Sequence, residues 1–154
     1  MEWITRVGEY RTLRGKRDQL GCALGRSEAA RLAELERFFA ACADPHRIPF
    51  VQRDQLRAAI SLFVTFRTGE ENCDGEARDV SGDGMFIATP RPLAPGKQTT
   101  IRVIDRYTGE EWRFAAEVVR AESHGMGLRL LGIPLALRLG HRGAPPHSPR
   151  RLAA

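Results

Sequence analysis

Cysteine is scarce in this chain, and its placement argues against two common kinds of site. The 154 residues include three cysteines, Cys22, Cys42 and Cys73, and none forms a C-x-x-C pair. A disulfide framework needs paired cysteines, and a structural zinc site needs clustered ligands. We therefore expect neither, and we interpret Cys22 and Cys42 as small apolar packing residues.

Long apolar runs are also lacking. No stretch approaches the roughly 20 uninterrupted apolar residues that a membrane-spanning helix needs. The N-terminal sequence MEWITRVGEYRTLRGKR has no apolar run of the kind found in signal peptides. We therefore expect a cytoplasmic protein with no membrane insertion.

Histidine provides no metal or catalytic cluster. The four histidines, His46, His124, His141 and His147, are isolated along the sequence and lack metal-ligand spacing. Ser81 has no glycine two residues before it, which a nucleophile elbow requires, and no histidine is placed to activate it. We expect a protein that is not an enzyme and that holds neither a metal nor a cofactor.

Basic residues outnumber acidic ones. Lysine and arginine total 24 against 19 aspartates and glutamates, for a net charge of +5. This excess favours an anionic partner, such as a nucleotide, a nucleic acid, an acidic protein or a membrane surface. Nucleic acid is the weaker choice, because the aromatic residues form no stacking stripe interleaved with basic ones.

Two amphipathic helices are predicted near the N-terminus. Apolar residues recur at helical spacing from Trp3 to Leu24, and a second helix is expected from Ser27 to Ala43. Ser27 is the predicted N-cap, with Glu28 in the first turn. The two helices are expected to form a hairpin that packs on the rest of the chain. The alternative is that the hairpin forms a homodimer or binds a downstream protein.

After Arg57 the pattern of apolar residues changes from helical to alternating. Ile60, Leu62, Val64 and Phe66 alternate with other residues, which predicts a first strand. Trp112 begins a second alternating run and is expected to lie in the core. Further strands are predicted at 76–80, 85–89, 99–107, 111–122 and 127–131. Six short strands with no helix between them favour an antiparallel barrel.

The fold class predicted is mostly β with an α extension: a six-stranded antiparallel β-barrel preceded by a helical hairpin. We expect residues 1–48 to form the hairpin extension and residues 49–134 the barrel. Residues 135–154 lose periodicity and gather glycine, proline and arginine, which predicts a basic, disordered tail.

Two short motifs stand at neighbouring places in the predicted barrel. Arg53-Asp54-Gln55-Leu56-Arg57 matches RxxxR directly before the first strand. Asp79-Val80-Ser81-Gly82-Asp83-Gly84 matches [DN]xSxxG between the second and third strands. On these motifs, and on the segments GDGMFIATPRPLAPGKQTTIRV and HGMGLRLLGIP, the chain resembles the PilZ domain family over residues 50–134.

The resemblance implies a PilZ-type barrel that binds cyclic di-GMP. Arg53 and Arg57 would form an arginine clamp over one outer face, and Asp79, Ser81 and Gly84 the strand-borne half of the site. The chemistry agrees, because a guanidinium pairs with phosphate or with guanine O6 and N7. A carboxylate accepts guanine N–H donors, and glycine permits close approach of the ligand.

Two alternatives remain. The first is a PilZ-like adaptor that contacts proteins without binding cyclic di-GMP, since acidic Asp54 follows Arg53 and no C-terminal helix is evident. The second is a calcium loop starting at Asp79, which is disfavoured because its twelfth position is Pro90 and not a bidentate glutamate. If cyclic di-GMP binds, ordering of the clamp is the expected signal.

Overall fold

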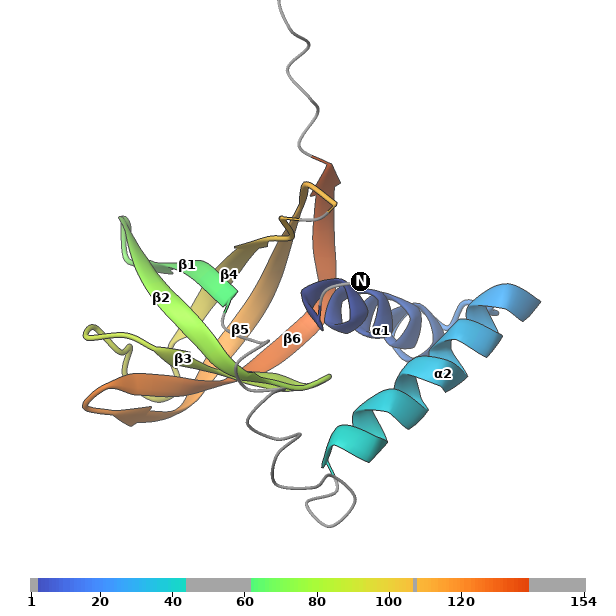
Figure 1. Cartoon of the computed structure of the whole chain (residues 1–154), viewed down its shortest axis with the longest axis horizontal. Coiled ribbons are helices and arrows are strands. Elements are labelled where there is room, and N and C mark those ends of the chain that lie inside the picture. Colours follow the sequence, from blue (N-terminus) through green and yellow to red (C-terminus); the bar gives the residue numbers. More distant parts are fainter. Residues whose placement is uncertain (1–2, 44–61, 107, 139–154) are drawn as a thin grey trace, which may run out of the picture.

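The computed structural model describes residues 3–43, 62–106 and 108–138. In these ranges two helices precede six strands: α1 (Trp3–Asp18), α2 (Arg26–Ala43), β1 (Leu62–Thr68), β2 (Glu71–Val80), β3 (Gly84–Ala88), β4 (Gln98–Ile104), β5 (Glu110–Glu122) and β6 (Gly125–Arg138). The strands form a closed antiparallel barrel in the order β1-β2-β3-β6-β5-β4. Helix α1 lies between the barrel and α2 (Figure 1). The predicted fold class is confirmed.

The core follows the alternation seen in the sequence. Inward-facing side chains from all six strands pack together, and Trp112 is 5% exposed among them, as predicted. Ile4 and Val7 of α1 are fully buried in the same cluster. Helix α1 is therefore part of the folded unit, because its apolar face contributes to the core of the barrel.

Helix α1 approaches the barrel closely because small residues line its contact face. A Cβ atom on Gly8 would overlap the ring of Trp112, and one on Gly15 would overlap the side chain of Ile133. The Thr5 hydroxyl donates to the carboxylate of Asp105, which is fully buried. The hairpin thus packs on its own barrel through α1.

Helix α2 packs on α1. Leu32 and Leu35 are buried in a small cluster with Tyr10 of α1. Ion pairs join the two helices, with Lys16 Nζ 2.7 Å from a carboxylate oxygen of Glu28. Neither helix is long and apolar enough to cross a membrane, and the described residues include no other helix.

The helix boundaries differ from the prediction at two glycines. Helix α1 ends at Asp18 and not at Leu24, because Gly21 adopts φ +61° and the Cys22 N–H donates to the Lys16 carbonyl, a glycine-based C-terminal cap. Cys22 is consequently exposed and not a packing residue. The side chain of Cys42 lies outside the described residues.

The N-terminal cap of α2 is also displaced from the predicted Ser27. Helix α2 begins at Arg26, and the Gly25 carbonyl accepts the first helical hydrogen bond, from the Ala29 N–H, at 2.9 Å. Glu28 accepts a hydrogen bond from the Gly25 N–H at 2.9 Å, as in one half of a capping box. The cap is therefore Gly25.

Strand β6 is longer than predicted and continues past a proline to Arg138. Its pairing with β5 is irregular between Leu131 and Leu135, where Gly132 has φ +57° and Pro134 has no N–H to donate. Regular pairing with β5 resumes at Leu135. Because Gly132 and Pro134 interrupt the alternating pattern, the sequence did not predict that the strand continues beyond them. Residues 135–138, assigned to the tail by sequence, belong to β6. The remainder of that tail lies outside the described residues.

Glu111 is a charged residue that the fold buries, with 1% exposure. Arg113 Nε donates to one carboxylate oxygen at 2.6 Å, and Arg102 Nε lies 2.9 Å from the other. Burial acts to raise the pKa of Glu111, but the hydrogen bonds from the two arginines outweigh it and hold the pKa below its ordinary value. Glu111 therefore links β4 to β5 as an ionised carboxylate.

Candidate ligand-binding site

The turn between β2 and β3 is closed by its own serine. The Ser81 N–H donates to the Gly84 carbonyl at 2.8 Å, and the Gly84 N–H donates to the Ser81 Oγ at 3.1 Å. Both backbone groups of Gly84 are thus paired with Ser81, while Ser81 remains exposed. The Ser81 hydroxyl accepts a hydrogen bond within the turn and can still form a further hydrogen bond with a ligand.

Gly84 stands where β3 passes very close to β6. A Cβ atom at this position would lie 2.7 Å from the backbone oxygen of Leu128. Backbone atoms cannot rotate away as a side chain can, so any larger residue would push the two strands apart. Glycine at the last position of the motif is therefore required by the close approach of β3 to β6.

A β-bulge in β2 turns Asp79 outward. Ala77 pairs with Ile87 and Asp79 with Phe86, so Arg78 is an extra residue without a partner in β3. Arg78 and Asp79 are consequently both exposed, although strict alternation from buried Ala77 would bury the second of them. The bulge places Asp79 on the same outer face as Ser81.

A second bulge, in β5, turns Arg120 toward the same face. Val118 pairs with Leu128 and Arg120 with Gly127, so Val119 is the extra residue. Arg120 crosses the backbone of Gly127, where a Cβ atom would lie 2.8 Å from its side chain. Its guanidinium carbon lies 5.6 Å from the ring centre of Phe86.

Arg120 and Asp79 therefore flank one strip of the outer face. Phe86 pairs with Asp79 on one side and with Gly127 on the other, so the strip crosses β2, β3, β6 and β5. Arg129 pairs with Gly84 in the next row, and its Nη2 lies 2.9 Å from a carboxylate oxygen of Glu117. The sequence motifs point to neither arginine.

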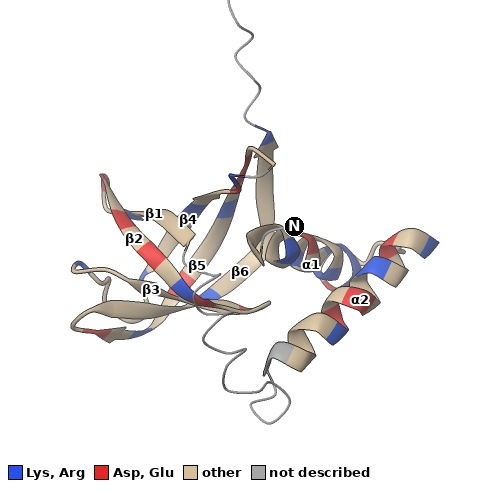
Figure 2. Cartoon of the chain, in the orientation of Figure 1, with Lys and Arg blue, Asp and Glu red and all other residues tan. Residues whose placement is uncertain are grey.

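Charge on the barrel varies from strand to strand. Strand β2 carries acidic residues along its length, and the helices carry both signs (Figure 2). Besides Asp79, the acidic residues of β2 are Glu71, Asp74 and Glu76. Strand β2 is thus mainly acidic, and basic and acidic residues lie side by side on the helices. An anion at the β2–β3 turn would have to be bound by particular arginines.

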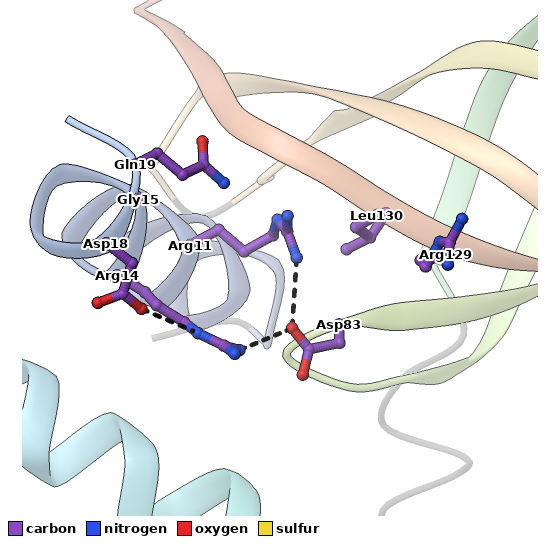
Figure 3. A pocket seen from close by; sticks show the side chains of 8 residues that line it. All are labelled: Arg11, Arg14, Gly15, Asp18, Gln19, Asp83, Arg129 and Leu130. Carbon is purple, nitrogen blue, oxygen red and sulfur yellow. Dashed lines mark hydrogen bonds and ion pairs between the residues drawn. The ribbon is translucent and has the colours of Figure 1, made fainter.

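Helix α1 holds the β2–β3 turn from outside the barrel. Arg14 Nη1 donates to Asp83 Oδ1 at 2.9 Å (Figure 3). Arg11 Nη1 donates to the Gly82 carbonyl at 3.3 Å. The ring of Tyr10 packs on Gly82 so closely that a Cβ atom there would overlap it. Burial lowers the pKa of Arg11 while Asp83 acts to raise it, and arginine stays charged at neutral pH in either case.

A pocket of about 330 Å³ opens between α1 and this end of the barrel (Figure 3). It is lined by Arg11, Arg14, Gly15, Asp18, Gln19, Asp83, Arg129 and Leu130. The Leu130 N–H donates to the Asp83 carbonyl at 2.9 Å and ties the turn to β6. The pocket begins at the motif turn, with guanidinium and carboxylate groups at its edge.

Three of the five predicted site residues, Asp79, Ser81 and Gly84, lie together at this turn. Arg53 and Arg57 lie outside the described residues. The described part of the chain holds no group of three histidine, cysteine, aspartate or glutamate side chains that could bind a metal.

A family model of the PilZ domain matches residues 51–139, more than half of the chain. This chain belongs to the PilZ domain family. The PilZ match ends next to the last residue of β6, Arg138, and it begins after α2. Both helices are therefore additions to the PilZ domain, and Arg11 and Arg14 contact its motif turn from outside the matched region.

Two solved structures resemble this PilZ protein at low identity. The PilZ domain of CeSA from a cellulose-synthesizing bacterium is 21% identical, with a TM-score of 0.40, over 46% of this chain and 74% of that one. The MrkH–c-di-GMP complex of K. pneumonia is 15% identical, with a TM-score of 0.46, over 64% of this chain and 43% of that one. No curated protein matches the chain.

Proposed function

We propose that this PilZ protein is a receptor for cyclic di-GMP and binds it on the outer face of the barrel through Arg53, Arg57, Asp79, Ser81 and Gly84. The supporting observation is the β2 bulge at Arg78, which exposes Asp79 on the same face as Ser81 beside a turn closed at Gly84. Membership of the PilZ family supports the ligand class.

The polar groups of the turn suit a guanine. The Asp79 carboxylate accepts hydrogen bonds from the N–H donors of a guanine edge, and the Ser81 hydroxyl acts as donor or acceptor. Gly84 adds no side-chain bulk beside the turn, and Gly127 leaves room for the Arg120 side chain that crosses it. The Arg120 guanidinium lies over the ring of Phe86 at the other end of the strip, and arginine and aromatic side chains are groups on which a purine ring can stack.

Arg53 and Arg57 lie outside the described residues, but the length of chain between them and β1 would allow them to reach this face. Leu62, the first residue of β1, pairs with Ala77 of β2, which is close in sequence to Asp79. Arg57 precedes Leu62 by five residues, which extended chain spans in at most about 18 Å. Arg53 and Arg57 then bind the phosphates or the guanine O6 and N7 from one side, while Arg120 and Arg129 do so from the other.

Binding fixes the Arg53–Arg57 clamp on the barrel, and this ordering relays the level of the second messenger. The protein performs no catalysis and acts in the cytoplasm through a downstream partner. That partner binds the N-terminal helices and is either another protein or a second copy of this chain.

Calorimetric titration with cyclic di-GMP tests the proposal. Wild-type protein should bind saturably, and Asp79→Ala and Arg57→Ala should lose binding while keeping the wild-type circular dichroism spectrum. Asp74→Ala is the matched control, because Asp74 is an exposed carboxylate on the same strand but pairs with Thr65, away from the turn. Absence of binding by the wild type would instead favour a PilZ-like adaptor that recognises protein alone.

A further inference from the structure

Three residues of α1 contact the β2–β3 turn, although α1 lies outside the matched PilZ region. Tyr10 and Arg14 are one helical turn apart and share a face, and Arg14 Nη1 donates to the Tyr10 hydroxyl at 2.8 Å. Arg11 lies beside them and also reaches the turn. The helix therefore presents a compact polar group to the ligand-binding motif.

Asp83 is the residue of the motif that α1 holds. It stands between Ser81 and Gly84, at a position where the motif allows any residue. Its carboxylate accepts a hydrogen bond from Arg14 at 2.9 Å, with Arg11 at 3.5 Å. Its backbone carbonyl accepts the Leu130 N–H. The turn is thus tied to α1 on one side and to β6 on the other.

Arg11 joins the same turn to the irregular part of β6. Its side chain is 10% exposed, and it donates to the Gly132 carbonyl at 2.9 Å and to the Gly82 carbonyl at 3.3 Å. Without it, two carbonyl groups under α1 would lose their donor. Arg11 therefore maintains the spacing of α1, the turn and β6.

We infer that α1 is part of the ligand-binding unit, with Arg11 and Arg14 as positioning residues that hold the β2–β3 turn in its binding conformation. The inference rests on the proposed function. The packing of α1 on the turn and the binding of cyclic di-GMP to the turn are then coupled, and each changes the free energy of the other by the same amount. Loosening α1 lowers the affinity for cyclic di-GMP, and bound cyclic di-GMP holds α1 more firmly on the barrel.

The decisive substitutions are at Arg14, because it is half-exposed and its loss leaves the core intact. Arg14→Ala should weaken the Kd for cyclic di-GMP by about fivefold or more, the lower end of typical coupling between sites. Arg14→Lys, which keeps a cation near Asp83, should recover most of the affinity. Arg17→Ala is the matched control on the same helix, because Arg17 pairs with Asp18 and with Glu36 of α2 and should leave Kd within about twofold.

A second variant and a second readout separate positioning from simple stability. Asp83→Asn removes the charge that Arg14 binds but keeps the backbone carbonyl that accepts from Leu130, and it should weaken Kd as Arg14→Ala does. In hydrogen exchange, the Leu130 amide of ligand-free Arg14→Ala should exchange faster than in the wild type. Addition of cyclic di-GMP to the wild type should slow exchange across α1.

The outcomes are distinguishable. Folded Arg14→Ala and Asp83→Asn variants with wild-type Kd would overturn the inference and leave the receptor function standing. Ligand protection of the barrel amides but not of α1 would overturn the coupling. A wild type that binds no cyclic di-GMP would overturn the receptor function and this inference with it, since no variant would then have a Kd to compare.

Discussion

Replacement of Gly84 by alanine tests the close approach of β3 to β6 at the motif turn. The added Cβ atom would lie 2.7 Å from the Leu128 carbonyl oxygen, closer than a real carbon–oxygen contact allows. The strands must separate by several tenths of an ångström or the turn must rotate. Forcing a methyl group into a packed site costs about 1–3 kcal/mol. For a chain of this length that lowers Tm by about 2–12 °C.

Thermal and urea denaturation of Gly84→Ala measure the stability loss, and calorimetry with cyclic di-GMP measures the effect on the site. Kd should weaken more than tenfold, because the separation displaces Ser81. Gly96→Ala is the control: Gly96 has φ +84° and open space around it, so the variant incurs only the backbone penalty, about 1–2 kcal/mol, and should bind normally. A Gly84→Ala protein as stable as the wild type would refute the steric argument. Wild-type Kd in a destabilised variant would refute the role of the turn in binding.

Three further predictions address the second flank of the site, the docking of α1 and the buried carboxylate. Arg120→Ala should weaken Kd by about 3- to 10-fold without changing Tm appreciably, measured by calorimetry and thermal melting; an unchanged Kd would remove Arg120 from the site. Gly8→Ala should lower Tm by several degrees in a thermal melt, because its methyl group overlaps Trp112; an unchanged Tm would contradict the close packing of α1. The stabilisation from Glu111 should be present above about pH 4.3, where unfolded glutamate titrates, and disappear as pH falls through its lower folded-state pKa. Urea unfolding across pH 3–6 should show less acid sensitivity in Glu111→Gln; identical pH profiles would exclude Glu111 as a contributor.

The barrel and its core were predictable from sequence because alternation survives wherever the ladders are regular. Leu62, Val64 and Phe66 point inward in β1 as their spacing predicts, and Trp112 lies in the core. The same patterning located the β2–β3 turn, since its glycines and serine interrupt two alternating runs. The six-strand prediction therefore rested on a physical periodicity that the structure retains.

The residues around the turn were harder to place, because bulges break that periodicity. Alternation from Trp112 through Val118 predicts that Arg120 points inward, and the extra residue Val119 turns it outward. Arg78 has the same effect for Asp79. A bulge depends on how two strands pair, so a single sequence offers no direct signal for it.

The contacts of α1 with the turn could not be predicted at all. Arg14 and Asp83 are 69 positions apart, and no spacing rule relates them. The sequence shows Arg11, Arg14, Lys16 and Arg17 on the first helix, but nothing in it distinguishes a solvated basic face from one that contacts the barrel. The structure shows that α1 packs against Trp112 and that Tyr10 packs against Gly82. These two contacts direct part of the basic face at the motif turn.

We propose that cyclic di-GMP binds the outer face of the barrel between the two bulges. The most direct test is a titration of ¹⁵N-labelled protein with cyclic di-GMP, followed by amide chemical shifts. Saturable shifts should concentrate at residues 79–86, 120 and 127–129, together with Arg53 and Arg57. Shifts confined to the outer faces of β1 and β4, or none at saturating ligand, would contradict binding at this site.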